Sequence, residues 1–310
     1  MTGSEANTWI PVQVAPATQR AYAADWHAFA SWCQARGESA LPADAETVLK
    51  WLTHQVEARY AVATITRRLL TVRREHLVAG HPCPVGTPEV QSYWYLARRH
   101  LGTAQRRVEP VTLERLQMMV ATCDASPAGR RDHALLVIGF AAALRRSELA
   151  QLDLEDVEPH HDGLVLTIRR SKGDQHGSGV RLGLPRGVNA VTCPERVLAA
   201  WQDHLKTTSG PLLRPVDRHG SIANRHLSGR AIAEIVKRRA AAAGLDPANY
   251  SGHSLRAGFA TSAATAGASE LAIARRTRHR SLAVLRTYIR EGDLFKLNAA
   301  TQIGLGLSPP

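Results

Sequence analysis

HRSLAVLRTYIREG, residues 279–292, is the stretch on which the interpretation of the fold and function of this chain depends. It contains Tyr288, one of only six tyrosines in the chain. Tyr288 follows Leu285 by three positions and Val284 by four, so its ring could pack with them on the apolar face of a helix. A tyrosine hydroxyl can also serve as a nucleophile. Distant parts of the sequence must decide between these two interpretations.

Length and hydropathy indicate a cytoplasmic protein of two domains. The chain has 310 residues and a mass of 33.7 kDa, which is long enough for two separate cores. No apolar run approaches the roughly 20 residues that cross a bilayer. The N-terminal sequence MTGSEANTWIPVQ has neither the basic nor the apolar region of a secretory signal. We therefore expect a cytoplasmic location and no membrane partner.

The charge balance points toward a polyanionic partner. Lys and Arg total 39 against 27 Asp and Glu, which gives a net charge of +12 and a pI near 10.2. A distributed excess of arginine suits nucleic acid. A high-GC composition that favours Ala and Arg would produce the same excess, so charge alone leaves both explanations open.

The spacing of the cysteines and the absence of nucleotide-binding motifs predict that the chain uses no cofactor and no metal. The closest pair of cysteines, Cys83 and Cys123, is 40 residues apart (123 − 83 = 40), so no CxxC pair exists. His81 and Cys83 form a lone pair without a second half. The sequence also has no Walker loop and no GxSxG motif. Reduced, unreactive thiols fit the cytosol.

Spacing of apolar residues divides the chain into parts. Tyr22, Trp26, Phe29 and Cys33 share one helical stripe, and three more such stripes follow before Gly102. The predicted organisation is an N-terminal tail (1–15), a four-helix domain (16–102), a basic linker (103–110), a mixed domain (111–290) and a C-terminal tail (291–310).

The outer helix faces of the four-helix domain carry many arginines. They are Arg67, Arg68, Arg73, Arg74, Arg98 and Arg99. These side chains are either solvated or directed at DNA.

The second domain is predicted to be mainly helical with a small β-hairpin. LVLTIRRSKGDQHGSGVRLGLP, residues 164–185, shows two strands around a turn from Ser171 to Gly179. Helices flank this hairpin on both sides. Thr192 and Glu195 have the spacing of a capping box, and Ser228 has the position of a helix cap.

Four short motifs carry residues suited to an anionic substrate. In HSLR, His253 and Arg256 lie three apart on one helix face, after a possible Ser251 cap, where a phosphate could bind. In ALRRSEL, Glu148 could brace Arg145. The two remaining candidates are Lys172 in the hairpin turn and His279, nine residues before Tyr288. Each motif alone is common.

Taken together, these motifs resemble the catalytic signature of the tyrosine recombinases, the phage integrase family, in order and in spacing. The signature consists here of Arg145, Lys172, His253, Arg256, His279 and Tyr288. The stretch TQRAYAADWHAFASWC, residues 18–33, is similar to the first helix of that family's core-binding domain. The layout is most like the simple Cre- and Xer-type site-specific recombinases. The resemblance implies a SAM-like core-binding domain over 16–102, an α+β catalytic domain over 111–290 and a possible trans-docking helix within 291–310.

The chain departs from the family pattern at two places. The family usually has Thr-Gly where this chain has Ala142 and Ala143, and glycine is common where it has Arg278. Neither change removes a catalytic side chain. Both are expected to affect the local backbone.

The resemblance also implies the chemistry. Tyr288 would attack a DNA phosphodiester, giving a 3′-phosphotyrosine and later a Holliday junction. Arg145 and Arg256 would stabilise the transition state, with Glu148 bracing Arg145. His253 would move the proton of the nucleophile, and His279 would add a hydrogen bond. Lys172 would protonate the departing 5′ oxygen.

The implied partners are double-stranded DNA with inverted-repeat sites and further copies of the chain, two on each site and four in the synapse. Three alternatives share some of these features: a type IB topoisomerase, a hairpin-forming strand transferase and a catalytically inactive DNA-binding protein. The presence of all six signature residues argues against the inactive protein. The sequence does not identify the DNA site, nor does it distinguish integration, excision, transposition and dimer resolution.

Overall fold

The structure is a computed structural model of the 310-residue chain. It describes residues 16–102, 108–169, 179–279, 282 and 285–288. Lys172, Val284, both predicted tails and most of the predicted linker lie outside these ranges. The chain divides into two compact units, Met1–Arg106 and Arg107–Pro310, which are described separately.

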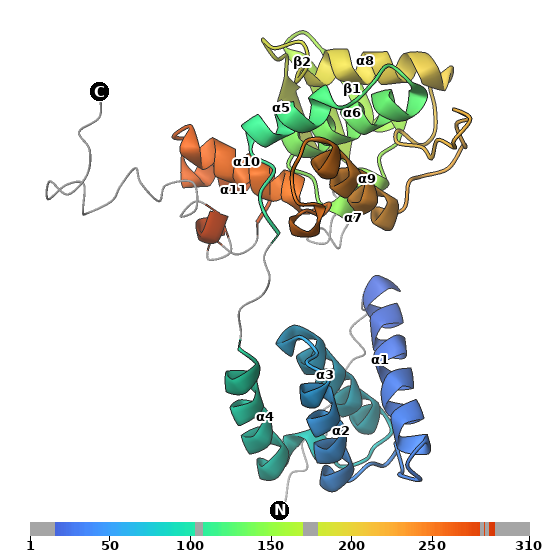
Figure 1. Cartoon of the computed structure of the whole chain (residues 1–310), viewed down its shortest axis with the longest axis vertical. Coiled ribbons are helices and arrows are strands. Elements are labelled where there is room, and N and C mark those ends of the chain that lie inside the picture. Colours follow the sequence, from blue (N-terminus) through green and yellow to red (C-terminus); the bar gives the residue numbers. More distant parts are fainter. Residues whose placement is uncertain (1–15, 103–107, 170–178, 280–281, 283–284, 289–310) are drawn as a thin grey trace, which may run out of the picture. The chain divides into compact units, whose positions relative to one another are not determined.

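The first unit is built from four helices (Figure 1). They are α1 (Pro16–Gln34), α2 (Ala45–Glu57), α3 (Val62–Val78) and α4 (Pro88–Leu101). The predicted stripe of the first helix faces the core, since Phe29 and Cys33 are fully buried. Trp51 of α2 packs edge-on against Phe29, with 4.8 Å between ring centroids. Burial of these large apolar side chains stabilises the unit.

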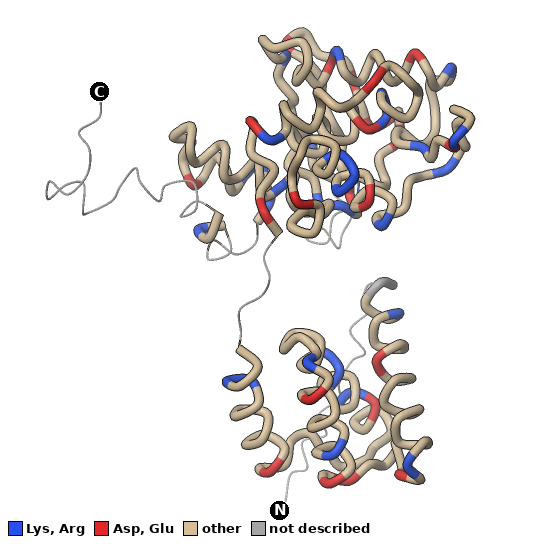
Figure 2. The backbone as a smooth tube through the Cα atoms, viewed as in Figure 1, with Lys and Arg blue, Asp and Glu red and all other residues tan. Residues whose placement is uncertain are grey.

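The arginines of the four-helix unit fall into two groups. Arg67 and Arg68 on α3 hold the buried carboxylate of Asp25 on α1, with Nε–Oδ distances of 2.6 and 3.6 Å. A buried carboxylate requires such partners, so these two cations tie the helices together. The other four predicted arginines are exposed on α3 and α4. Basic residues are distributed over both units (Figure 2).

In the described ranges, the second unit combines seven labelled α-helices, a further helical stretch at 285–288 and one three-stranded sheet. The helices are α5 (Leu113–Ala121), α6 (Pro127–Ala141), α7 (Arg146–Ala150), α8 (Pro194–Leu205), α9 (Gly229–Ala242), α10 (Ser254–Thr265) and α11 (Glu270–Thr277). The antiparallel strands are β1 (Val157–His160), β2 (Gly163–Ile168) and β3 (Val180–Pro185), in the order β1-β2-β3. The predicted fold class, mainly α with a small β-sheet, is confirmed.

The sheet contains the predicted hairpin and one additional strand. Leu164 pairs with Leu184 and Leu166 with Leu182, so that the apolar positions of β2 and β3 share one buried face. β1 was not predicted. Its sequence, VEPH, is mostly exposed and has none of the apolar alternation that identifies a half-buried strand.

Of the two caps predicted for α8 and α9, one is wrong. Ser228 caps α9, since its Oγ accepts a hydrogen bond from the backbone N of Ala231 at 3.1 Å. The capping box of Thr192 and Glu195 does not form. Helix α8 begins instead at Pro194, and the carboxylate of Glu195 binds Arg186, with Nε–Oε2 at 2.6 Å. The ion pair with a neighbouring segment replaces the local cap.

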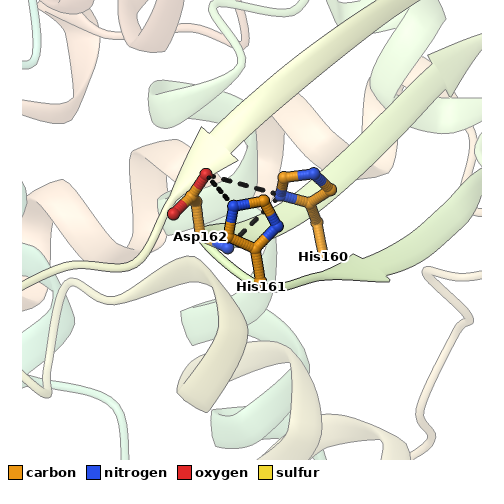
Figure 3. A group of neighbouring side chains, drawn as sticks. All are labelled: His160, His161 and Asp162. Carbon is orange, nitrogen blue, oxygen red and sulfur yellow. Dashed lines mark hydrogen bonds and ion pairs between the residues drawn. The ribbon is translucent and has the colours of Figure 1, made fainter.

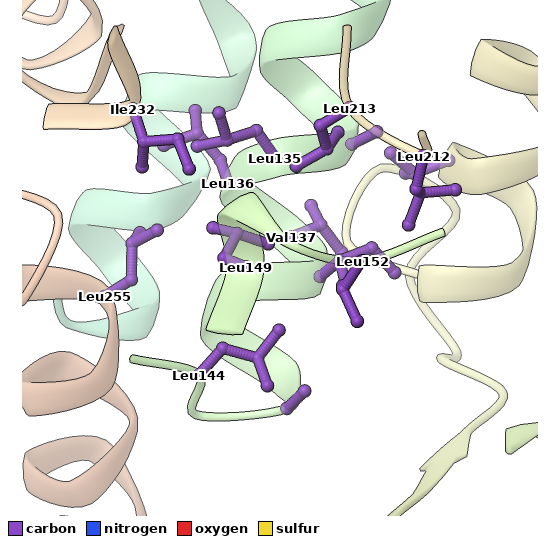
Figure 4. Close-up of a cluster of buried hydrophobic side chains, with 14 of the residues drawn as sticks. Leu135, Leu136, Val137, Leu144, Leu149, Leu152, Leu212, Leu213, Ile232 and Leu255 are labelled. Atoms are coloured by element: carbon purple, nitrogen blue, oxygen red, sulfur yellow. The ribbon is translucent and has the colours of Figure 1, made fainter. Parts of the chain in front are cut away.

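The core of the second unit surrounds α6 (Figure 4). Leu135, Leu136 and Val137 of α6 meet Leu149 of α7 and Leu255 of α10 in this cluster. Gly139 permits the close approach, because a Cβ there would lie 2.8 Å from Leu255 Cδ1 and 3.0 Å from Leu149 Cδ2. The hydrophobic core therefore fixes α7 and α10, the two helices whose N-terminal ends carry Arg145 and the HSLR motif.

The first residues of the second unit form a strap along α10. The backbone N of Val111 donates to Ser254 O at 2.9 Å, and that of Leu113 donates to Ser262 Oγ at 2.9 Å. Val111 crosses α10 at Gly258, where a Cβ would overlap the Val111 carbonyl oxygen. Only glycine fits at this crossing.

None of the helices in the described ranges combines the length and the apolar character that crossing a bilayer requires.

Replacing Gly258 with alanine is predicted to destabilise the second unit by about 1–3 kcal/mol, because the added methyl group meets main-chain atoms that cannot turn aside. The free energy of unfolding in urea would measure this. Gly183→Ala is the matched control, since Gly183 is exposed in β3 and has open space around its Cα. Equal stability of the two variants would contradict the proposed role of the crossing.

Candidate active site

The HSLR motif lies at the start of α10. The helix begins at Ser254 and its N-cap is His253, so the predicted cap by Ser251 is wrong. The Ser251 hydroxyl instead accepts a hydrogen bond from the His253 backbone N, at 3.1 Å, before the helix begins. Arg256 is therefore in the first turn and only 2% exposed. Its Nη1 donates to Ala143 O at 2.8 Å, and its buried Nη2 has no hydrogen-bond partner among the described residues. A buried, unpaired guanidinium nitrogen is a donor available for an anion.

Arg145 is held at the start of α7 by Glu148. The carboxylate of Glu148 accepts hydrogen bonds from the Arg145 backbone N at 2.8 Å and from Arg145 Nη1 at 2.5 Å. The side chain of Glu148 is 2% exposed, and that of Arg145 is 23% exposed. Arg145 thus keeps part of its side chain at the surface, while Glu148 fixes its orientation.

Arg278 joins this pair from the end of α11. Its Nη2 lies 2.7 Å from Glu148 Oε2, and its carbonyl oxygen accepts a hydrogen bond from Arg145 Nη2 at 3.0 Å. Arg278 is the C-cap of α11 in the left-handed conformation, with φ 55° and ψ 43°. Ala143 also has a positive φ of 47°. Both departures from the family pattern therefore occupy backbone conformations that glycine adopts most easily.

The two histidines and Tyr288 lie together. The Nε2 atom of His253 and the Oη atom of Tyr288 are 3.1 Å apart. The ring centroids of His279 and Tyr288 are 6.0 Å apart. Tyr288 is half-buried and packs against a small apolar cluster that includes Ile273 and the fully buried Leu285. The ring thus has apolar contacts while the hydroxyl faces an imidazole, an arrangement that is compatible with both interpretations of this tyrosine.

Thr277 sets the hydrogen bonding of His279. The Thr277 hydroxyl lies 2.7 Å from the Ile273 carbonyl oxygen, to which it donates its single proton. Its oxygen must then accept from the Nδ1–H of His279, 2.7 Å away. In the neutral ring, this leaves Nε2 of His279 as an acceptor.

The site is strongly cationic, and the pKa values of its groups respond to that charge. Burial and then the positive charges of Arg256 and Arg145 lower the pKa of His279 to about 4. The same causes lower the pKa of His253, although part of its surface is exposed. Burial and the neighbouring arginines lower the pKa of Arg256 to about 9. Burial alone would raise the pKa of Glu148, but Arg278 and Arg145 hold it below its ordinary value.

Lys172 lies outside the described residues, and only its surroundings can be given. β2 ends at Ile168, and Ile168 and Arg169 line an open pocket together with Glu148. The described end of β2 therefore lies beside Glu148.

One group of potential metal ligands occurs in the part of the chain that the structure describes. Ligand atoms of His160, His161 and Asp162 lie within 4.8 Å of one another at the exposed end of β1 (Figure 3). Asp162 already contacts His161 at 2.9 Å, and its backbone N donates to His160 Nδ1 at 3.2 Å. Three exposed consecutive residues that contact one another make a weak case for a metal site, and we assign this group no part in the chemistry.

Sequence reasoning missed two residues of this site. Thr277 belongs to none of the sequence motifs, and Arg278 stands out in the sequence only as a departure from the family pattern. The sequence does carry a signal for Arg278. An arginine in place of a common glycine indicates that a positive charge lies at this position of the site.

The chain is similar in sequence to a known protein family and to individual members of it. Residues 109–293 match the pattern of the Phage integrase family. An integrase/recombinase XerD homolog of Selenomonas ruminantium is 38% identical over 92% of this chain and 85% of its own length. The tyrosine recombinase XerD of Xanthomonas axonopodis pv. citri is 28% identical over 94% of this chain and 93% of its own length.

Two solved structures share the fold. A lambda integrase dimer bound to a COC′ core site matches with a TM-score of 0.61 at 15% identity, covering 90% of each chain. XerH site-specific recombinase bound to a palindromic difH substrate matches with a TM-score of 0.58 at 20% identity, covering 84% of this chain and 72% of its own.

These findings confirm the predicted class, a tyrosine-type DNA strand transferase of site-specific recombination. The chain belongs to the phage integrase family.

Acid is predicted to destabilise the folded protein through His279. Its folded pKa of about 4 lies below the ordinary value of 6.5, so the unfolded chain binds the proton more tightly. The stability that results is complete above pH 6.5 and is lost as the pH falls from there toward 4. Urea unfolding of DNA-free protein at pH 7.5 and 5.0 would measure the loss. His279→Gln should lose less than wild type, by about 1 kcal/mol. Equal losses would contradict a lowered pKa of His279 in the folded protein.

Proposed function

We propose that this chain is a site-specific DNA recombinase in which Tyr288 is the nucleophile. The observation that carries the proposal is the 3.1 Å separation of Tyr288 Oη and His253 Nε2 beside two arginines of the same site. An unperturbed tyrosine has a pKa near 10. It needs a proton acceptor and a cationic environment to attack a phosphodiester at neutral pH.

The proposed reaction exchanges one phosphate ester for another. The bond from Tyr288 Oη to phosphorus forms while the bond from phosphorus to the 5′ oxygen breaks. The tyrosine proton moves to Nε2 of His253, whose lowered pKa keeps its ring neutral at pH 7. A 3′-phosphotyrosine and a free 5′-hydroxyl result, and attack by another 5′-hydroxyl reverses the step. Exchange between two duplexes then passes through a Holliday junction.

Arg145 and Arg256 are the proposed clamp for the transition-state charge. Arg256 has an unpaired Nη2, and Arg145 is braced so that its orientation is fixed before DNA binds. Preorganised donors of this kind stabilise charge that develops on the non-bridging oxygens. Two guanidinium groups supply positive charge where many phosphoryl-transfer enzymes use metal ions.

Two further roles complete the proposal. His279 would donate a hydrogen bond to the phosphate through Nε2, once the anionic phosphate has raised the pKa of the ring and the ring has taken up a proton from water. Lys172 would give its proton to the departing 5′ oxygen. The end of β2 beside Glu148 supports this assignment, because Lys172 follows Arg169 by three residues.

The proposed partner is duplex DNA, bound by both units in the cytoplasm. The net charge of +12 supports this partner. The lambda integrase and XerH structures are bound to a core site and to a palindromic substrate. We therefore propose inverted-repeat sites, two copies of the chain on each site and four in the synapse. The trans-docking role of residues 291–310 stays a prediction.

Tyr288→Phe is predicted to abolish covalent attachment to DNA. Wild-type protein is incubated with a library of nicked duplexes in which cleavage releases a short fragment and traps the covalent product. Sequencing of the attached DNA identifies the site. Tyr60→Phe is the matched control, since Tyr60 is an exposed tyrosine of the first unit. Attachment that persists in Tyr288→Phe would overturn the mechanism, and relaxation of supercoiled plasmids of any sequence would favour a topoisomerase.

Arg256→Lys is predicted to slow attachment by about 10²–10³-fold, because lysine lacks the second, unpaired guanidinium nitrogen. DNA binding, measured by fluorescence anisotropy on the same duplex, should change by less than about tenfold. A variant that cleaves at the wild-type rate would show that the unpaired Nη2 has no part in the reaction.

A further inference from the structure

We propose that Arg278 is a positioning residue for the reaction, which keeps the bracing carboxylate of Glu148 from neutralising Arg145. This inference rests on the proposed function and adds a residue to it. Arg278 is absent from the six-residue signature and would not touch the DNA. Its effect would pass through Glu148 and through the backbone that precedes His279.

The charge balance of the contact between Glu148 and Arg145 favours this role for Arg278. Glu148 alone with Arg145 would form a pair of zero net charge, which would weaken the attraction of Arg145 for a phosphate. Arg278 places a second guanidinium on the other carboxylate oxygen, 2.7 Å from Oε2. Arg145 and Arg278 against Glu148 then give +1 (2 − 1 = 1). Glu148 can orient Arg145 without cancelling its charge.

Burial makes this balance effective. The side chain of Arg278 is 11% exposed, and that of Glu148 is 2% exposed. Water therefore screens the contact poorly, and the charge of Arg278 acts at close to full strength on its neighbours.

Arg278 also connects the turn before α7 to the end of α11. The guanidinium of Arg278 donates to the carbonyl oxygens of Ala142 at 3.4 Å and Arg276 at 3.0 Å. Its own carbonyl accepts from Arg145 Nη2. The side chain and the main chain of one residue thus tie the turn before α7 to the end of α11. His279 follows directly, so the clamp and the second histidine are placed relative to each other.

The backbone conformation of Arg278 also favours a role for its side chain. Arg278 has φ 55°, a conformation that is unfavourable for a residue with a Cβ. Glycine would adopt it without strain. The contacts of the guanidinium offset this cost, which is what a side chain with a role at the site would do.

The backbone conformation also makes the test sharp. Arg278→Gly removes the guanidinium and relaxes the backbone, so any loss of rate belongs to the side chain. Arg278→Lys restores a positive charge without the fork. The chain tolerates lysine in this conformation, since Lys206 has φ 51°. Lys206→Gly is the matched control, because it removes an exposed cation from the same conformation at the end of α8.

The measurements are the single-turnover rate of attachment to the trapped duplex, the DNA dissociation constant and the melting temperature by circular dichroism. Arg278→Gly should bind DNA within about threefold of wild type and attach about 10–100-fold more slowly, since misplaced catalytic groups lose rate rather than affinity. If Arg278→Gly attaches about 100-fold more slowly than wild type, Arg278→Lys should attach at least about tenfold faster than Arg278→Gly. If the loss in Arg278→Gly is smaller, Arg278→Lys should recover most of it. Lys206→Gly should match wild type.

Three outcomes would overturn the proposal. Attachment by Arg278→Gly at the wild-type rate would show that the guanidinium is dispensable. Equally slow attachment by the glycine and lysine variants would exclude the charge effect. If Arg278→Gly does not fold, attachment by Arg278→Lys no faster than about 1% of wild type decides against the charge effect in the same way. Failure of wild type itself to attach to any duplex would instead reject the proposed function.

Discussion

The site depends on the ionised, buried carboxylate of Glu148. A charge removed from water must be paired and hydrogen-bonded, or it takes up a proton. Glu148 has a backbone N–H and two guanidinium groups as its partners. These partners come from the turn before α7 and from the end of α11. One buried anion therefore determines how two distant segments meet.

The hydrophobic core places the groups that meet at this carboxylate. Helix α6 carries no candidate catalytic residue, yet α7 and α10 both pack on it through Leu149 and Leu255. The turn that leaves α6 presents the carbonyl of Ala143 to Arg256. Apolar packing thus sets the positions of α7 and α10, and the polar contacts then fix the orientation of the side chains that these helices carry.

Much of the fold could be predicted because apolar periodicity reflects burial directly, as at Phe29 and Cys33. Local polar patterns were less reliable: Ser228 caps its helix, whereas Glu195 pairs with Arg186 instead. The candidate residues were found from their order along the chain. Their geometry was not predictable, because the left-handed conformation of Arg278 and its contact with Glu148 depend on segments about 130 residues apart in sequence. No periodicity records such a contact.

The strap along α10 has a mechanical consequence. The chain that enters the second unit is fastened first at Glu109, to Asn249 and Tyr250, and then through Val111 to Ser254 of α10. Tension along the connecting peptide would thus be applied to the segment that leads into α10 and to the first turn of that helix. Because glycine at position 258 lets the strap lie directly on the helix, the attachment has little slack. The entry point of the polypeptide is therefore mechanically coupled to the turn that carries His253 and Arg256.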